Sequence, residues 1–368
     1  MNWKKLPESQ GWLQSFGEWA VRQHTFMPRM IDLEVSRVCN LSCPACMRRA
    51  DSSLSHMDEK YCTLDRFREI YEQIPTLGTL NFMGDGEPLM NPEINDIIHF
   101  ASLNGIFTVI TTNATLVTME AVEFWKHNNV YRVHASVDAA TKRTYEKMRV
   151  GAKWEKTLEN LRLIGASGIP FCLNTVLTSK NMEEMPKMAI LAHDVGASEI
   201  TFLMPICAHE TDIDVRPKLN ERNHQLFAET KSLCDKLGIK WIFPLKLDPT
   251  FRRFSFPFIR PEISVEGDIW ACCYSLGRGT NWVMDHPIII KPGTYNMGNM
   301  FKEGFREVWY GDAYRELREV YKRSEVRKGT VITRLEYLRR ILEVENRENG
   351  GRFDHCEICP ARWGTACS

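Results

Sequence analysis

The chain has 368 residues, which is enough for two domains or for one large domain with a sizeable core. Lys plus Arg and Asp plus Glu both number 47, so the formal net charge is zero and no basic surplus argues for nucleic acid as a partner. The sequence has no run of about 18 apolar residues and no apolar signal core near its start, so we expect a cytoplasmic protein without a membrane partner.

The first 29 residues are predicted to form a helical segment. Trp12, Phe16 and Trp19 recur at spacings of four and three, as they would on one face of an amphipathic helix. We expect this helix to pack on the end of a barrel.

Residues 30–215 alternate between strand and helix patterns. Six segments predict β-strands, at 30–35, 80–83, 107–111, 131–136, 170–177 and 199–203. The segments between them predict helices, at 64–74, 92–104, 118–126, 154–164 and 183–195. Such alternation predicts a parallel α/β layout, which right-handed crossovers curl into a barrel or a doubly wound sheet. Because there are six units rather than eight, we expect a partial (β/α)6 barrel that is open along one side.

The carboxyl ends of barrel strands carry the loops that form an active-site face. The first four strands each deliver a distinctive sequence there: the loop with Cys39, Cys43 and Cys46, then Gly84-Asp-Gly-Glu-Pro88, Thr111-Thr-Asn113 and Ser136-Val-Asp138. This convergence predicts one site built from four loops.

The remainder of the chain is predicted to be a connection and a second domain. Residues 216–257 contain a helix at 222–237 and a short strand at 240–243. Residues 258–368 are expected to form a small α+β domain, with a β-hairpin around Glu266-Gly267, helices at 305–320 and 331–347, and three terminal cysteines.

Twelve cysteines are many for a chain of this length, and most of them are grouped at 39–46, 272–273 and 356–367. Metal ligation explains such grouping better than disulfide bonds do in a cytoplasmic protein. We interpret Cys62, Cys172 and Cys234, which lie outside these groups, as structural thiols.

The first group has gaps of three and two residues, in the pattern Cys39-x3-Cys43-x2-Cys46. Thiolates select soft metals and iron-sulfur clusters, and three of them can hold one iron-sulfur cube while leaving one iron open. A zinc knuckle or buried structural thiols are the alternatives. Zinc prefers four ligands, usually with CxxC pairs, and no such set fits nearby.

This spacing resembles the signature of the radical SAM enzymes. The resemblance implies a 4Fe-4S cluster whose open iron is chelated by the amino and carboxylate groups of S-adenosylmethionine (SAM). An electron from the cluster would then cleave the sulfonium to a 5'-deoxyadenosyl radical, which abstracts a hydrogen atom from a substrate. The chain departs from the family at Ala45, where an aromatic residue is common.

The resemblance also implies which residues bind SAM. Gly84, Asp85, Gly86 and Glu87 resemble the family's glycine-glycine-glutamate motif, with Asp85 in place of one glycine, and would accept hydrogen bonds from the methionine ammonium. An ordinary turn between strand and helix is the alternative for this loop.

Further SAM contacts are implied at the fourth and sixth strands. Ser136 and Arg149 resemble the serine and arginine that hold the methionine carboxylate in relatives, since a guanidinium fork fits a carboxylate. A solvent-facing arginine is the alternative for Arg149. On the same analogy, backbone near Leu203 would contact the adenine edge.

The second domain resembles the SPASM/twitch extension of many radical SAM enzymes. A full SPASM domain needs seven or eight cysteines for two clusters, whereas five lie beyond residue 260. We therefore expect one auxiliary 4Fe-4S cluster, held by Cys272, Cys356, Cys359 and Cys367, with Cys273 as the substitute for Cys272. A zinc site with the same ligands is the alternative.

An auxiliary cluster favours an oxidative reaction, because a substrate radical that loses a proton must also lose an electron. The main hypothesis is a radical SAM oxidoreductase that dehydrogenates a small hydroxylated substrate, such as an aminosugar or cyclitol, with the auxiliary cluster accepting the electron. An electron donor such as flavodoxin or ferredoxin would supply the first cluster.

Three alternative functions remain open. The first is modification of a peptide, as in sulfatase maturation or the processing of ribosomal peptides. The second is a radical epimerase in which Cys207, just after the sixth strand, donates a hydrogen atom, although a packing thiol is also compatible with that position. The third is a non-catalytic iron-sulfur or zinc protein, which would not cleave SAM.

Overall fold

The computed structural model describes residues 27–46, 59–203, 205, 220–242, 260–271, 280–283, 286–289 and 295–323. The predicted N-terminal helix and the predicted helix at 331–347 lie outside these ranges. In the described part of the chain, no helix combines the length and apolar character that a membrane span requires.

The first part of the described chain alternates between strands and helices, as the sequence predicted. Its elements are β1 (Met30–Leu33), α2 (Leu64–Gln73), β2 (Thr79–Phe82), η3 (Pro88–Met90), α3 (Ile94–Leu103), β3 (Phe107–Thr112), α4 (Met119–His127), β4 (Val130–Ser136), α5 (Lys142–Met148), α6 (Trp154–Ala166), β5 (Phe171–Val176), η4 (Met182–Glu184), α7 (Met185–Asp194), β6 (Glu199–Leu203), α8 (Glu221–Leu237) and β7 (Lys240–Ile242). Helix α5 was not predicted.

The second part is shorter and mixed. Its elements are β8 (Glu262–Ile263), β9 (Asp268–Trp270), β10 (Thr280–Val283), β11 (His286–Ile289), β12 (Asn296–Asn299), α10 (Met300–Glu303), α11 (Phe305–Tyr310) and α12 (Asp312–Arg323). The single helix predicted at 305–320 was wrong, because Gly311 separates α11 from α12. A Cβ on Gly311 would lie 2.7 Å from the carbonyl oxygen of Glu307, so the backbone is too close there for a side chain.

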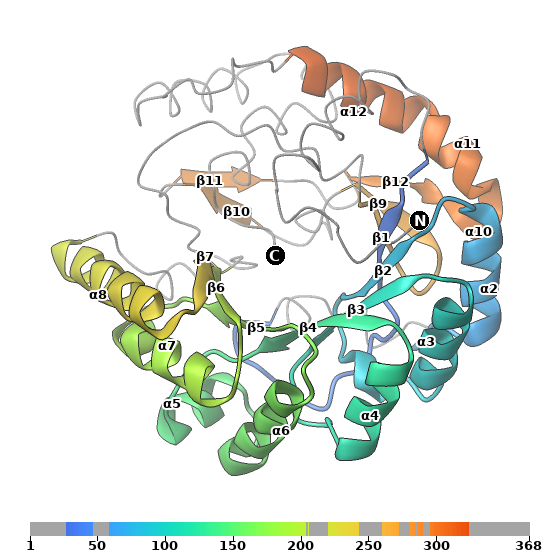
Figure 1. Ribbon diagram of the computed structural model, residues 1–368. Coiled ribbons are helices and arrows are strands. Elements are labelled where there is room, and N and C mark those ends of the chain that lie inside the picture. The colour runs from blue at the N-terminus through green and yellow to red at the C-terminus, as the bar shows by residue number, and fades with distance from the viewer. Residues whose placement is uncertain are drawn as a thin grey trace.

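Ten of the described strands form one sheet, in the order β12-β9-β8-β1-β2-β3-β4-β5-β6-β7, and β10 and β11 form a separate antiparallel pair. Neighbouring strands from β1 to β7 are parallel. Figure 1 shows these strands in an arc with helices α2 to α8 on its outer side. Within the described ranges β12 and β7 are the two ends of the sheet, so the barrel is open. This arrangement confirms the predicted partial (β/α)6 barrel.

The helix starts follow from local sequence. Thr63, Thr118 and Asn220 each stand before a helix, and each side chain accepts a hydrogen bond from a backbone N–H of the first turn, at 3.3, 3.2 and 2.9 Å. These caps satisfy donors that the helix itself leaves unpaired. Helix α8 ends at Gly238 in the left-handed conformation, with φ 69°.

The barrel strands separate two environments by their two-residue period. Residues such as Ile31, Leu80, Val133 and Leu173 are fully buried in the core cluster that extends to the helices. The alternate positions include polar side chains, among them Asp32, Asn81, His134, Asn174 and Thr201, and they face the inside of the arc. The apolar layer holds the barrel together, and the polar layer leaves its interior available for chemistry.

The second part of the chain is joined to the barrel through β1. Strand β8 pairs with β1 in parallel, and β9 pairs with β8 antiparallel, which confirms the hairpin predicted around Glu266-Gly267. At this junction, Arg260, which precedes β8, and Asp32, which lies in β1, form an ion pair of 2.7 Å. Their side chains are 14% and 4% exposed. The connection between the two parts therefore includes a buried charge pair.

We predict that Arg260→Met lowers the free energy of unfolding by about 3–5 kcal/mol, because removing one partner leaves the buried Asp32 carboxylate without its cation. Denaturant unfolding monitored by circular dichroism would measure the change. Lys156→Met is the matched control, since Lys156 and Glu159 form an exposed pair at 2.9 Å, and it should cost about 0–1 kcal/mol. Equal losses in both variants would contradict a structural role for the Asp32–Arg260 pair.

Candidate active site

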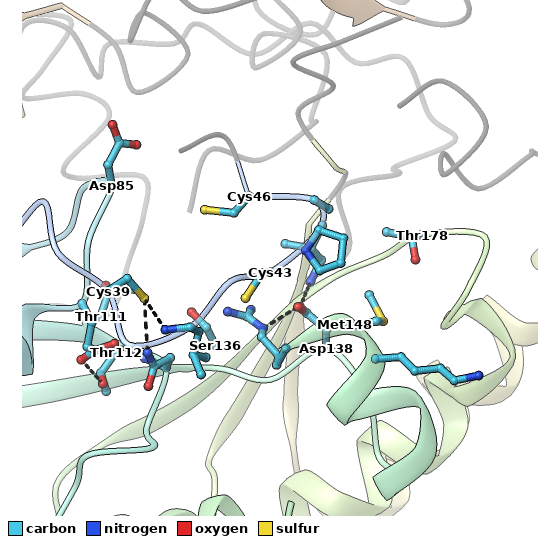
Figure 2. Close-up of a pocket in the computed structure, with 18 of the residues that line it drawn as sticks. Cys39, Cys43, Cys46, Asp85, Thr111, Thr112, Ser136, Asp138, Met148 and Thr178 are labelled. Atoms are coloured by element: carbon cyan, nitrogen blue, oxygen red, sulfur yellow. Dashed lines mark hydrogen bonds and ion pairs between the residues drawn. The ribbon is translucent and has the colours of Figure 1, made fainter. Parts of the chain in front are cut away.

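Three cysteines lie together on the loop that follows β1. Cys39, Cys43 and Cys46 line one cavity of about 890 Å³, and each is a free thiol. Figure 2 shows their labelled side chains around the same space. The turn between the last two is fixed by a hydrogen bond of 3.2 Å from the Cys46 N–H to the Cys43 carbonyl. The predicted three-thiolate site is thus assembled by one short loop.

The cavity is closed by the loops after β2, β3 and β4, as the sequence predicted. Its lining includes Gly84, Asp85, Gly86 and Glu87 from the second loop, Thr111 to Asn113 from the third, and Ser136 and Asp138 from the fourth. Parallel strands end at the same edge of the sheet, so these loops converge although they are far apart in sequence.

The loop after β2 packs directly on the backbone of the cysteine loop. A Cβ on Gly86 would lie 2.2 Å from the carbonyl oxygen of Ser36, and a Cβ on Gly84, whose φ is 146°, would lie 2.8 Å from the Glu34 side chain. The Glu87 N–H donates to the Val38 carbonyl at 2.8 Å. Only glycine permits this approach, so both glycines position the cysteine loop.

The Glu87 carboxylate joins two loops below the cavity wall. It accepts hydrogen bonds from the Thr112 hydroxyl at 2.5 Å, from the Asn113 N–H at 2.7 Å and from the Leu89 N–H at 3.2 Å. Burial raises the pKa of Glu87 above its ordinary value, and these donors oppose the rise. The structure therefore gives Glu87 a bridging role, and its predicted contact with the SAM ammonium stays a prediction.

Asn113 connects that bridge to the first cysteine. Its side-chain nitrogen lies 3.7 Å from the Cys39 sulfur and 3.0 Å from the side-chain oxygen of Asn40. The Leu41 N–H also points at the Cys39 sulfur, at 3.5 Å. Two N–H donors at one sulfur stabilise a thiolate, which is the form that binds a metal. The sequence marked Thr111-Thr-Asn113 as unusual but did not assign this role.

Arg149 lies at the other end of the cysteine loop, in an ion pair of 2.6 Å with Asp138. Burial alone would lower the pKa of Arg149, but the adjacent Asp138 and Cys43 outweigh it and raise the pKa. Burial raises the pKa of the Cys43 thiol, and the Arg149 guanidinium opposes that rise. Arg149 therefore supports the charged form of Cys43. Asp138 is a site residue that the sequence did not identify, although it closes the Ser136-Val-Asp138 motif.

The three thiols also affect one another. Both Cys39 and Cys46 act to raise the pKa of Cys43, which places the three groups within electrostatic reach. Among the described residues, no three His, Cys, Asp or Glu side chains converge on one point suited to a single ion. In a 4Fe-4S cube each thiolate binds a different iron atom, so a spread set of three cysteines with N–H donors at sulfur fits that group.

The other predicted site residues lie in two places. Leu203 ends β6 at the same edge of the sheet, and its carbonyl accepts a hydrogen bond of 2.7 Å from the Leu177 N–H. Cys207, Cys272, Cys273, Cys356, Cys359 and Cys367 lie outside the described residues. The described range 260–271 ends at Ala271, directly after β9 and one residue before Cys272.

Comparison with protein families matches residues 33–192 to the radical SAM superfamily and residues 256–330 to SPASM, an iron-sulfur cluster-binding domain. The chain therefore contains a radical SAM domain. Its SPASM domain lies C-terminal to the radical SAM domain, as the sequence predicted. A 4Fe-4S cluster and SAM are therefore cofactors of this radical SAM enzyme, and its SPASM domain implies auxiliary iron-sulfur binding.

Individual relatives of this radical SAM enzyme differ in their reactions. The AdoMet-dependent heme synthase of Methanosarcina barkeri is 26% identical over 312 residues, which span 80% of this chain and 86% of that protein. The PqqA peptide cyclase of Gluconobacter oxydans is 28% identical over 179 residues, 47% of this chain and 48% of that enzyme. The crystal structure of Streptococcus suis SuiB bound to precursor peptide SuiA has a TM-score of 0.61 at 17% identity, over 85% of this chain and 73% of that chain.

The interior of the radical SAM barrel contains a second polar cluster, on β4, β5 and β6. The His134 ring lies 3.5 Å from the Asn174 side-chain oxygen, and the Cys172 sulfur lies 3.4 Å from that same oxygen and 3.5 Å from the Thr201 hydroxyl. Burial lowers the pKa of His134 to about 4, and Arg132 adds to the effect. His134 is therefore neutral at physiological pH.

We predict that Cys39→Ala, Cys43→Ala and Cys46→Ala each lose about four iron atoms per chain, because a 4Fe-4S cube needs all three thiolates. Iron analysis and the visible absorption of anaerobically reconstituted protein would measure the loss. Cys62→Ala is the matched control, since burial raises the pKa of that thiol to about 12 and keeps it protonated. Retention of the full iron content in any of the three variants would contradict the assignment.

We predict a pH-dependent stability that comes from His134. The unfolded chain binds a proton at this histidine near pH 6.5, whereas the folded chain does so only near its pKa of about 4. The unfolded state therefore holds more protons between these values, and stability falls as the pH falls. Between pH 7.5 and 5.5 the wild type should lose about 1–2 kcal/mol that His134→Asn retains. Identical pH profiles in denaturant unfolding would exclude this role.

Proposed function

We propose that this radical SAM enzyme modifies a peptide, through hydrogen-atom abstraction from a residue placed in the cavity beside the three cysteines. The observation that supports this proposal is the match to the PqqA peptide cyclase, which extends over nearly half of each chain. A C-terminal SPASM domain accompanies the barrel here. The relatives favour this alternative over the dehydrogenation of an aminosugar or cyclitol, which stays a prediction.

We propose separate roles for the residues that line the cavity. Cys39, Cys43 and Cys46 would hold the 4Fe-4S cluster, with Asn113 and Arg149 stabilising two of the thiolates. When bound, the cluster and SAM supply reductive cleavage of the sulfonium and abstraction of a hydrogen atom. Arg149 is paired with Asp138 through Nε, so its terminal N–H groups are the donors that it could offer to the SAM carboxylate.

Other assignments at the same cavity are part of the proposal. Ser136 would share the carboxylate with Arg149, and the loop from Gly84 to Glu87 would face the SAM ammonium. Backbone near Leu203 would contact the adenine. A cavity of about 890 Å³ is near the upper end of the range of about 300–1,000 Å³ for small-molecule sites, so it has room for more than one bound group.

In the second domain, we propose that Cys272, Cys356, Cys359 and Cys367 hold one auxiliary cluster, with Cys273 as the alternative to Cys272. Such a cluster would accept an electron from the oxidised substrate radical. Flavodoxin or ferredoxin would reduce the cluster at the barrel.

A second candidate function is the modification of a tetrapyrrole. The match to the heme synthase covers 86% of that protein, which is more than the peptide cyclase match covers of its own. A tetrapyrrole and a peptide both exceed SAM in size, so the same open cavity could serve either.

We expect the reconstituted enzyme, given SAM and dithionite without oxygen, to form 5'-deoxyadenosine, and to form more of it when its peptide substrate is added. Mass spectrometry would follow the product and the transfer of deuterium from peptides labelled at the α- or β-carbons. Labelled aminosugars and a porphyrin serve as the competing substrates. Deuterium transfer from either of those, with none from any peptide encoded near the enzyme's gene, would overturn the proposed function.

A further inference from the structure

The wall of the cavity formed by α5 and the loop after β5 carries an excess of positive charge. Arg143, Lys147 and Lys180 line the cavity and have exposed side chains. Within the described part of the chain, the side chains of these three residues form no ion pair and no hydrogen bond. We call these three residues the basic wall.

Helix α5 keeps two kinds of charged residue on neighbouring faces. Lys142 forms an ion pair with Glu155 at 2.7 Å, and Glu146 accepts a hydrogen bond from the Trp154 N–H at 3.0 Å. Lys142 and Glu146 are four residues apart, and so are Arg143 and Lys147, each one position later on the helix. The second pair has like charges, and like charges at this spacing destabilise a helix slightly. The charges facing away from the cavity are therefore matched within the protein, and those facing the cavity are not.

The backbone that carries Lys180 is fixed in place by a buried network. Asn181 donates to the carbonyls of Asp138 and Val176, at 2.6 and 2.8 Å, and accepts from the Thr178 N–H at 2.6 Å. The Lys180 N–H donates to the Thr178 hydroxyl at 3.2 Å. This loop presents Lys180 from a rigid support, which favours a binding role over a solvated surface charge.

The negative groups of the cavity do not neutralise the basic wall. Asp138 is paired with Arg149, and Glu87 is buried beneath its three donors. Asp85 lies on the opposite side of the view from Met148 and Thr178, the labelled neighbours of the basic wall (Figure 2). The cavity thus has a cationic side that no acidic lining residue covers.

SAM does not account for this charge. Its sulfonium, ammonium and carboxylate sum to one positive charge, so three further cations would oppose its binding. Arg149 lies beside Cys43 and opposes the rise of its pKa, so that guanidinium would meet the negative charge of a bound cluster there, whereas the basic wall is exposed. The remaining occupant of the cavity is the substrate.

We propose that the basic wall binds carboxylates of the substrate, and that the substrate is an acidic peptide segment, with Asp or Glu close to the residue that loses a hydrogen atom. The inference rests on the proposed peptide modification and narrows it to one class of peptide. Each exposed ion pair contributes only modestly to the free energy of binding. Several such contacts are therefore needed, and the three cations of the basic wall would pair with several carboxylates of a short acidic segment. The charges would also speed the encounter at low ionic strength.

The test uses two peptides of about twelve residues with the same neutral fluorophore, one rich in Glu and the other with every Glu replaced by Gln. Fluorescence anisotropy with the anaerobic, SAM-loaded full chain reports binding without any turnover. We expect the Glu peptide to bind at least about tenfold more tightly than the Gln peptide, and to lose this advantage in R143Q/K147Q/K180Q and in higher salt.

A matched variant removes three positive charges elsewhere. K126Q/K156Q/K231Q neutralises lysines that form exposed ion pairs on α4, α6 and α8, and it should bind the Glu peptide as the wild type does. If the triple variant folds poorly, two other measurements replace it. They are the salt dependence of Glu-peptide binding by the wild type and the binding of that peptide by the single variants K147Q and K180Q. Equal binding of the two peptides by the wild type would overturn the inference.

Other outcomes separate the inference from the proposed function. Charge-dependent peptide binding without deuterium transfer from any peptide would support the basic wall and refute peptide modification. Modification of neutral and acidic peptides at equal rates would support peptide modification and refute the proposed role of the basic wall. A dipropionate porphyrin that binds through the three cations, while the Glu peptide does not, would assign the wall to a tetrapyrrole and overturn the peptide class. Unchanged peptide binding with slower flavodoxin-driven turnover would assign it to the electron donor and also overturn the inference.

Discussion

The buried carboxylate of Glu87 is the interaction on which the rest of the site depends. Its backbone N–H holds the cysteine loop at Val38, and its two oxygens hold the loop after β3 through Thr112 and Asn113. Asn113 in turn reaches the sulfur of Cys39. A carboxylate removed from water is costly unless donors surround it, so the three loops are held to one arrangement. The same interaction explains why Gly86 is needed, because the loop can only reach Val38 by passing against the backbone of Ser36.

The charged residues at the cavity form two sets, which we call the inner layer and the outer layer, and the two sets have different roles. The inner layer consists of the Arg149–Asp138 ion pair beside Cys43, and its Arg149 guanidinium supports the thiolate form of Cys43. The outer layer, the basic wall, lines the cavity, is exposed and has no ion-pair partner among the described residues. This division suits chemistry in which the metal site must stay fixed while substrates bind and leave.

The cysteine loop is also tied to the SPASM domain. Arg37, two residues before Cys39, pairs with Glu34 and with Glu266 at 2.9 Å each, and Glu34 accepts from the Val265 N–H at 3.2 Å. Glu266 lies on the turn between β8 and β9, and β9 ends just before Cys272. The cysteine loop and the hairpin of β8 and β9 are therefore connected through a short set of ion pairs and one shared sheet.

The sequence by itself determined the features that depend on neighbouring residues: the spacing of Cys39, Cys43 and Cys46, the strand–helix alternation, and the glycines of the second loop. It missed α5 because that helix buries only Tyr145, so its periodicity is weak. Only the tertiary structure decided that Glu87 bridges loops, that Asp138 pairs with Arg149 beneath Cys43, and that β8 joins β1. These contacts unite residues far apart in the chain, and they are set by strand order and register, which no local pattern of residues specifies.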